Sequence, residues 1–297
     1  MKILIMPSKV DEIPKYKDCS GFIIGLERMS VMTPLQVSIE EIKKISLELK
    51  QSKKELFVSI NKLMYNKDIP LLKEYLLILE DIDIDGLIFD DLAVFNMAKS
   101  LKIRTPLVYF GVHFLTNQYT SNFWYEKGVQ YGILSTEITL DHIQEICSNT
   151  KMTTMMYGYG YLPMFVSSRP LISSYFKHIG KTYEQKVYNM YEEQRKKMYP
   201  TYESEDGTVI LSSDVINIIC ELPTLSTSVD YVILSSLNIE ENRFFNVYNY
   251  YVEALSHLED KDKLCEISKK VSDQMQGKTD KGFLYKETVY RVKNNEK

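Results

Sequence analysis

The stretch MMYGYGYLPMFVSSRPLISSYF, residues 155–176, lies in the middle of the chain and joins two kinds of sequence. Its first part, up to Tyr157, is apolar and is typical of the end of a buried strand. Glycines then interrupt the run, and prolines, serines and aromatic residues follow around a single arginine, Arg169. This mixture is typical neither of a repeat nor of a flexible linker. It predicts a strand that leads into a specific, ordered loop.

The strand predicted at 153–157 is one of eight short apolar runs in the chain. The runs are apolar throughout, as expected for strands that are covered on both faces. Segments with helical patterns lie between many of them, such as 38–50, where Ser38 and Glu41 have the spacing of a capping box. Alternating strands and helices favour parallel pairing through right-handed crossovers, and eight such strands fit a closed (β/α)8 TIM-type barrel. A doubly wound open sheet is the alternative. The eight runs are 3–6, 22–25, 56–60, 86–89, 106–110, 131–134, 153–157 and 231–236.

The seventh and eighth runs are separated by far more residues than any other neighbouring pair. We therefore predict an insertion at 158–212, within a single domain that spans 1–297. An insertion of this length is usually functional or forms a small subdomain. Its Tyr- and Glu-rich part, 182–200, is interpreted as helical. After the eighth strand, 240–297 predicts a C-terminal extension of two helices and a tail.

The composition is that of an ordinary globular protein, with 44% hydrophobic and 26% charged residues. The net charge of −4 and the pI of about 5.7 argue against a protein that coats nucleic acid through its overall charge, although a local basic patch remains possible. No apolar run has the length of a membrane span, and the start MKILIMPSK is too short a pattern for a signal peptide. We expect a cytoplasmic protein that does not contact the membrane.

The four cysteines, Cys19, Cys147, Cys220 and Cys265, are far apart in the sequence and form no CxxC pair. This spacing speaks against a disulfide framework and against a zinc knuckle. In a cytoplasmic protein we expect all four thiols to be reduced.

The sequence has no HExxH, GxSxG, P-loop or GxGxxG motif, so candidate site residues follow from the fold. In a parallel barrel, functional residues lie just past the carboxyl ends of the strands. Two charged residues at such places, Glu137 and Arg169, could face a common cleft. Polar residues at other strand ends are the remaining cleft candidates: Asn61, Asn117, Tyr159 and Ser167.

Three further residues near strand ends are given structural interpretations. Asp90 and Asp91 directly follow the fourth strand and are interpreted as helix caps. His113 follows the fifth strand and is the histidine best placed for a cleft, but a structural role is the favoured interpretation.

The stretch quoted first resembles the signature of the collagenase-like peptidases, peptidase family U32. That signature is approximately His-Gly-x-x-Cys, a spacer, and Ser-x-Arg-Cys-Leu-x-Ser. Gly160 matches its glycine, and Ser167, Arg169, Leu171 and Ser173 match its second half. Other parts of the chain are similar to the family as well: 56–66 with Asn61, 132–146 with Glu137, 199–219 and 281–290.

The departures from the signature concern a cofactor. Many family members hold an iron–sulfur cluster through four cysteines, two of them in the signature, and here Pro163 and Pro170 stand at those two positions. Tyr159 stands at the signature histidine. Proline has no thiolate to offer to iron. The resemblance therefore implies a member of the family without a cluster, and we expect no other cofactor and no metal site.

The resemblance leaves three hypotheses for function. The first is a cluster-free accessory subunit in tRNA wobble-uridine hydroxylation, which works beside a larger, cluster-bearing paralogue and meets tRNA through that complex. The second is a peptide hydrolase in which Glu137 acts as acid or base and Arg169 as an anion clamp. The third is a barrel that binds a small molecule without chemistry.

The prolines at the signature positions give a first prediction. Protein purified alone without oxygen is expected to be colourless and to contain neither iron nor acid-labile sulfide, because two of the four cluster thiolates are missing. Metal analysis and a visible absorbance spectrum check this. Iron and sulfide in the stoichiometry of one cluster per chain would contradict it.

Overall fold

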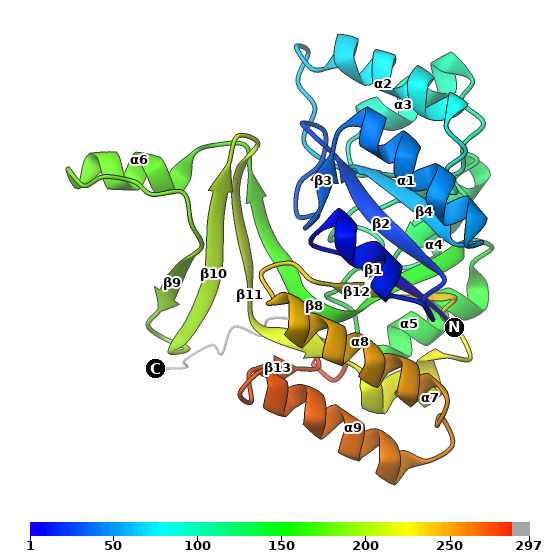
Figure 1. Cartoon of the computed structure of the whole chain (residues 1–297), viewed down its shortest axis with the longest axis vertical. Helices are drawn as coiled ribbons and strands as arrows, with labels where there is room; N and C mark the ends of the chain where they lie inside the picture. The colour runs from blue at the N-terminus through cyan, green and yellow to red at the C-terminus, as the bar shows by residue number, and fades with distance from the viewer. Residues whose placement is uncertain (287–297) are drawn as a thin grey trace, which may run out of the picture.

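In the computed structural model, which describes residues 1–286, eight parallel strands form a closed barrel (Figure 1). Strand β12 pairs with both β1 and β8 and so closes the ring. Each of the eight predicted apolar runs overlaps one of these strands, so the TIM-type barrel is confirmed and the open sheet is not formed. The barrel strands are β1 (Lys2–Met6), β2 (Gly21–Leu26), β4 (Glu55–Ile60), β5 (Gly86–Phe89), β6 (Leu107–Tyr109), β7 (Tyr131–Ile133), β8 (Thr153–Ser167) and β12 (Tyr231–Ser235).

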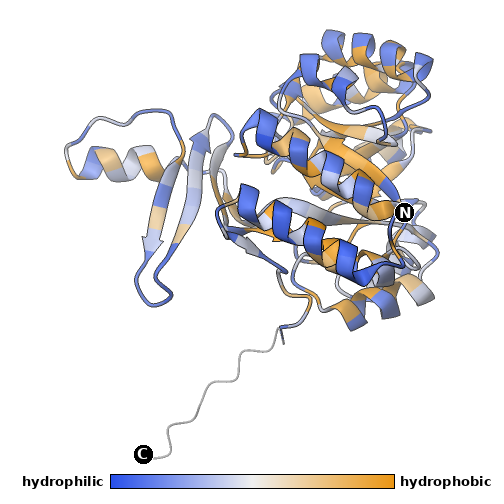
Figure 2. Ribbon diagram, turned by 60° about the horizontal axis from the view of Figure 1, so that its bottom comes forward, coloured by the Kyte–Doolittle hydropathy of each residue, from blue (hydrophilic) through white to orange (hydrophobic). Residues whose placement is uncertain are grey.

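The barrel strands are buried on both faces, which explains their apolar composition. Every residue of β2, β5, β6 and β12 is buried. Figure 2 shows hydrophobic residues concentrated in these central strands and hydrophilic residues on the outer faces of the surrounding helices. The burial of this continuous apolar core is the main force that stabilises the barrel.

Helices surround the barrel, and two of them begin with residue patterns that can be recognised in the sequence. Ser38 and Glu41 form the predicted capping box at the start of α1. Pro70 lies in the first turn of α2, where its missing N–H leaves no hydrogen bond unmade. The barrel helices are η1 (Val10–Lys15), α1 (Ile39–Gln51), α2 (Ile69–Asp81), α3 (Leu92–Leu101), α4 (Gln118–Glu126), α5 (Leu140–Asn149), η2 (Ile219–Glu221), α7 (Leu222–Leu225) and α8 (Glu241–Leu255).

Strand β8 continues beyond the barrel into a projection that we call the arm, residues 161–215 (Figure 1). The outer half of β8 pairs antiparallel with β11 (Gly207–Asn217). Two more strands, β10 (Lys197–Ser204) and β9 (Tyr188–Glu192), extend this sheet, and helix α6 (Leu171–His178) lies at its far end.

The helix predicted at 182–200 is wrong, because this segment forms the β9–β10 hairpin. The turn between the strands contains Lys196 in the left-handed region, with φ of 54°. The segment contains four tyrosines, and aromatic side chains fit the pleated surface of a strand well. The many charged residues that favoured a helix are tolerated because β9 is exposed along most of its length.

The arm contacts the barrel through the β10–β11 turn and the bend that follows β8. The ammonium group of Lys62, in the loop after β4, lies 3.2 Å from a carboxylate oxygen of Asp206 in the β10–β11 turn and 3.3 Å from that of Asp68. The hydroxyl of Tyr65 in the same loop forms a hydrogen bond with Ser168 just past the end of β8. These contacts hold the arm against one side of the barrel's carboxyl end.

The C-terminal segment packs against both the barrel and the arm. As predicted, two helices follow the last barrel strand, α8 and α9 (Lys261–Gln274). The short strand β13 (Thr279–Asp280) then pairs with β11, as β3 (Gln36–Val37) does with β2. Of the tail predicted at 281–290, residues 281–286 are described and include the buried Leu284, whereas 287–290 lie outside the described residues. No helix within residues 1–286 has the length and apolar character needed to cross a membrane.

Gly160 marks the point where β8 leaves the barrel. Its φ is +127°, which L side chains rarely adopt, and a Cβ there would lie 2.8 Å from the carbonyl oxygen of Ser235 in β12. The strand can therefore bend outward and stay close to β12 only if this residue is glycine.

Replacing Gly160 by alanine is expected to lower the free energy of unfolding by at least about 3 kcal/mol, because backbone strain and overlap add. Gly180 is the matched control, since its φ of +67° is also positive but nothing lies within 4 Å of its Cβ position. Gly180→Ala is expected to lower stability by only about 1 kcal/mol. Urea denaturation compares the two variants, and equal losses would contradict the role given to Gly160.

Candidate functional site

A hollow of about 300 Å³ opens at the carboxyl ends of the barrel strands. We call it the mouth hollow. Its barrel side includes Asn61, Asp90 and His113, which follow β4, β5 and β6, and its arm side is formed by residues 163–166 of β8. The arm therefore forms one wall of a site in the position where TIM-type barrels carry their chemistry.

Asn61 is held in a fixed orientation at the base of the mouth hollow. It is 5% exposed, and its side-chain oxygen accepts a hydrogen bond of 2.9 Å from the backbone N–H of Val31. Below it, the space inside the barrel is only about 10 Å³, because side chains such as Phe110 and Tyr157 fill the centre. A ligand larger than a water molecule can therefore enter the mouth hollow but not the barrel interior.

Asp90 is the most perturbed carboxyl group of the mouth hollow. Burial raises its pKa from 3.8 to about 6, and repulsion from the neighbouring Asp91 adds to this shift. Asp91 itself is the N-cap of α3, where its side chain accepts from Ala93 N–H at 2.8 Å. The cap interpretation is confirmed for Asp91, whereas Asp90 faces the hollow. A carboxyl group with this pKa can exchange a proton near neutral pH.

His113 and Glu137 form an acid–base pair at the edge of the mouth. The Nδ1 atom of His113 lies 3.4 Å from a carboxylate oxygen of Glu137, which makes an ion pair when the imidazole is protonated. This Nδ1 atom is buried and has no hydrogen bond of good geometry within the described residues. Glu137 also lines a neighbouring hollow of about 320 Å³ between the barrel and the arm.

Arg169 lies apart from Glu137. It is exposed in the bend between β8 and α6, and it lines neither the mouth hollow nor the hollow beside Glu137. Its backbone N–H donates to the Ser167 hydroxyl at 3.2 Å, and its carbonyl oxygen accepts from the Thr208 hydroxyl at 2.8 Å. Arg169 and Ser167 therefore lie in a bend of the arm that these hydrogen bonds hold in place.

The two other predicted cleft residues also lie away from the mouth hollow. Asn117 is the N-cap of α4, and its side-chain oxygen accepts from Thr120 N–H at 2.9 Å. Tyr159 is fully buried against Phe244 and Tyr251 of α8, and burial raises the pKa of its hydroxyl. Of the predicted cleft residues, Asn61 lines the mouth hollow and Glu137 lies at its edge through His113.

The side chains at the signature positions do not fit an iron–sulfur cluster. Pro163 lies in β8 beside the mouth hollow, and Pro170 precedes the first residue of α6. Neither side chain has an atom that can ligate iron. Within residues 1–286, no group of three or more His, Cys, Asp or Glu side chains is arranged to hold a metal ion.

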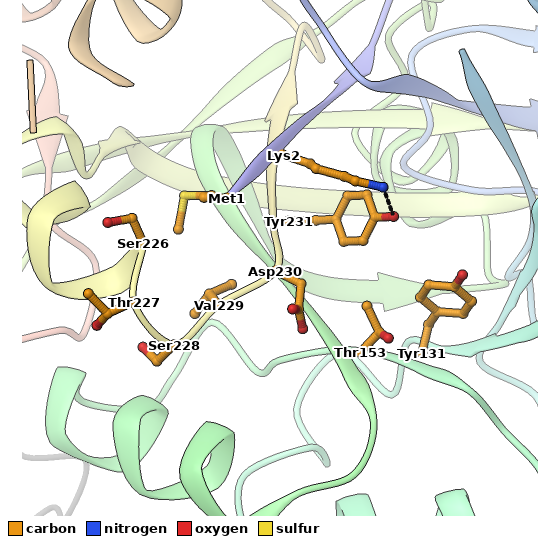
Figure 3. Close-up of a pocket in the computed structure, with 10 residues that line it drawn as sticks. All are labelled: Met1, Lys2, Tyr131, Thr153, Ser226, Thr227, Ser228, Val229, Asp230 and Tyr231. Atoms are coloured by element: carbon orange, nitrogen blue, oxygen red, sulfur yellow. Dashed lines mark hydrogen bonds between the residues drawn. The ribbon is translucent and has the colours of Figure 1, made fainter. Parts of the chain in front are cut away.

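A larger hollow of about 430 Å³ lies at the opposite end of the barrel, where the strands begin (Figure 3). Its polar groups bind one another. Lys2 Nζ donates to the Tyr231 hydroxyl at 3.1 Å, and the Asp230 carboxylate accepts from Thr154 N–H at 2.8 Å. Side chains at this end of a TIM-type barrel usually serve stability, so the mouth hollow is the better candidate site.

Fold and site together define an α/β barrel protein with a candidate site at the carboxyl end of its strands. Comparison with known families then identifies the group to which it belongs. The sequence model of Peptidase family U32 matches residues 22–294, and the chain belongs to this family.

Two curated relatives and one solved structure are similar to the chain. The tRNA hydroxylation protein P2 of Bacillus subtilis is 29% identical over 97% of this chain and 99% of its own length. An uncharacterized protease of Methanocaldococcus jannaschii is 30% identical over 41% of this chain and 30% of its own. The structure of a U32 peptidase, at 12% identity, covers 78% of this chain and 91% of its own with a TM-score of 0.51, which shows the shared fold.

Sequence reasoning gave too little weight to Asp90 and His113. The doublet Asp90–Asp91 held a usable signal, because only the residue directly before the helix can be its N-cap and the other carboxyl is then free to face the mouth. The pairing of His113 with Glu137 joins loops after two different strands and has no local sequence signal.

Asp90→Asn is expected to stabilise the protein at pH 7.5 by about 2–3 kcal/mol and to leave its stability nearly unchanged at pH 4. The raised pKa means that the unfolded chain loses its proton first as the pH rises from 3.8 to about 6, which disfavours the folded state over this range. Asn117→Ala, which removes the uncharged cap of α4, is the control and should lose about 1 kcal/mol at both pH values. Urea denaturation at the two pH values measures this. An Asp90→Asn variant that is less stable at pH 7.5 would contradict the assignment.

Proposed function

We propose that this protein is a cluster-free accessory subunit in tRNA wobble-uridine hydroxylation, which works in the cytoplasm beside a larger, cluster-bearing paralogue. The observation that carries the proposal is the likeness to tRNA hydroxylation protein P2, which extends over 97% of this chain and 99% of the relative. An alignment of this extent includes most of the arm as well as the barrel. The relative therefore shares the part of the chain that distinguishes this protein from a simple barrel.

The chemistry of the signature segment supports the accessory role. Pro163 and Pro170 offer no ligand to iron, so redox chemistry that depends on a cluster would take place on the partner. The backbone of the segment is nevertheless ordered, with Pro163 in β8 and Pro170 at the start of α6. An ordered segment without the thiolates is what we expect of a subunit that positions the RNA or the partner protein and does not carry out the redox step.

The outer part of the arm supports contact with an anionic macromolecule. Residues 171–198 carry six Lys or Arg against three Glu, although the whole chain has a net charge of −4. No residue of α6 is buried, and hydrophobic and hydrophilic residues alternate along it (Figure 2). Exposed aromatic rings beside cations are typical of surfaces that stack on unpaired bases. The exposed large hydrophobic side chains of residues 171–198 are Leu171, Tyr175, Ile179, Val187, Met190, Tyr191 and Met198.

A peptide hydrolase is the second candidate, and the acid–base groups of the mouth favour it. Asp90, with a pKa of about 6, and the His113–Glu137 pair could transfer protons to and from a substrate in the mouth hollow. A barrel that binds a small molecule without chemistry would use the same hollow. Glu137→Gln distinguishes the hydrolase from the binding barrel, because it removes proton transfer by Glu137 and leaves the shape of the side chain nearly unchanged. A hydrolase would lose activity, whereas a binding barrel would still bind its ligand.

Reversing charges on the arm is expected to lower tRNA hydroxylation several-fold without loss of the fold, because the basic surface would repel the phosphates of tRNA. The variant is Lys177→Glu with Lys181→Glu, both exposed on the arm. Lys43→Glu with Lys44→Glu, exposed on α1 of the barrel, is the matched control and should act as wild type. The gene for each double variant replaces the chromosomal copy of the wild-type gene. Mass spectrometry of the tRNA nucleosides then measures the amount of hydroxylated uridine.

Three outcomes decide between the candidates. A selective defect of the arm variant supports the accessory role. Wild-type hydroxylation in a strain that lacks the gene would overturn it. Peptide turnover by the purified chain that Glu137→Gln abolishes would favour the hydrolase instead.

A further inference from the structure

Two cysteines that are 45 residues apart in the sequence meet near the base of the arm. The Sγ atoms of Cys220 and Cys265 are 4.0 Å apart. Cys220 lies in η2, directly after the arm strand β11, and Cys265 lies on α9. This pair could not be predicted from the sequence, because the contact depends on how α9 packs against η2.

The two thiols differ from the rest of the cysteines in exposure and in neighbours. Cys265 is exposed and Cys220 is half-buried, so reagents in solution can reach the pair. Cys19 is buried and donates to the carbonyl oxygen of Tyr16, and Cys147 contacts the hydroxyl of Thr154. Within residues 1–286, neither of these two thiols forms a hydrogen bond with another thiol.

The surroundings hold the two thiols in place. The side-chain amide of Asn217, at the end of β11, donates to the Ser268 carbonyl at 3.2 Å and so fixes the position of α9. Lys281 forms an ion pair with Glu221, the residue after Cys220. A disulfide bond is about 2.05 Å long, so each sulfur would need to move by only about 1 Å. Rotation about the Cα–Cβ bonds can supply such a movement.

We propose that Cys220 and Cys265 form a reversible disulfide when the protein meets an oxidant, and that this bond fastens α9 to η2. The site goes beyond the proposed function and does not depend on it. A metal site is the less favoured reading of the pair, since within residues 1–286 no third His, Cys, Asp or Glu joins the two thiols in a metal-binding arrangement. Reversible disulfides in cytoplasmic proteins commonly serve as redox sensors.

The reaction uses a low-molecular-weight disulfide as the oxidant. The thiolate of the exposed Cys265 attacks one sulfur of the reagent, a mixed disulfide forms, and one small thiolate leaves and takes up a proton. The Cys220 thiolate then attacks the Cys265 sulfur, the internal disulfide forms, and the second small thiolate leaves. Two protein thiols are oxidised, one small disulfide is reduced to two thiols, and the protein loses two hydrogen atoms.

The bond would connect the arm to the C-terminal segment more firmly. After α9 the chain reaches β13, where Thr279 pairs with Val215 at the base of the arm. Fixing α9 to η2 therefore also restrains this pairing. The disulfide closes a loop that contains β12 and α8, and loop closure of this kind destabilises the unfolded chain. We expect the Tm to rise by roughly 5 °C on oxidation.

The rate of oxidation is expected to increase with pH. The neighbouring thiol of Cys220 is the main cause that raises the pKa of the Cys265 thiol above its ordinary value of 9.0. The reactive thiolate is therefore a minor form at neutral pH and becomes more abundant in alkali.

The test treats the purified full chain with oxidised glutathione and compares it with the reduced protein. Intact mass under denaturing conditions is expected to fall by the mass of two hydrogen atoms, and a peptide digest should contain the segments around Cys220 and Cys265 joined together. Cys265→Ser, a change at an exposed position, should abolish both signals and the rise in Tm. Cys147→Ser is the control and should retain them.

Several results would overturn the proposal. One is a mass that stays that of the fully reduced chain, and another is a mass that stops at a mixed disulfide with glutathione on Cys265. A third is a Cys265→Ser variant that still loses two hydrogen atoms, which would place the bond elsewhere. Loss of thiol reactivity without any loss of mass after denaturation would point to a captured metal ion and not to a disulfide.

Discussion

Strand β12 pairs with β8 along Tyr231–Leu234, and the rest of the structure depends on this pairing. It closes the ring of parallel strands, so it removes the open sheet edge that an unclosed barrel would present. The same β8 then leaves the barrel at Gly160, where it passes so close to Ser235 of β12 that no Cβ fits. One strand thus belongs to two structures, the barrel and the arm, and its bend fixes how the arm stands beside the mouth.

The candidate site follows from this arrangement. The barrel contributes Asn61, Asp90 and His113 from loops after three neighbouring strands, and the outer half of β8 contributes the facing wall. Because side chains fill the barrel centre, a ligand in the mouth hollow stays outside the barrel interior. Burial of the Asp90 carboxyl group is the main cause of its raised pKa.

The sequence predicted the elements whose pattern is local. Buried parallel strands are apolar throughout, so all eight could be recognised, and the Ser38–Glu41 cap was recognised because its two residues lie within one turn. The β9–β10 hairpin was predicted as a helix because it lies outside the core and keeps its charged residues. Contacts between distant segments, such as His113 with Glu137 and Cys220 with Cys265, could not be predicted from the sequence. The position of Arg169 away from the mouth hollow could not be predicted either, because it depends on how the arm bends.

The central claim is that this chain lacks the cluster and serves a partner that carries it. The most direct measurement is to isolate the protein under anaerobic conditions from its own cells, to identify what comes with it by mass spectrometry, and to record the visible spectrum. The account predicts a larger paralogue of the same family and a brown complex, whereas the chain expressed alone is colourless. A protein that is isolated alone and colourless from cells that hydroxylate their tRNA would contradict the account.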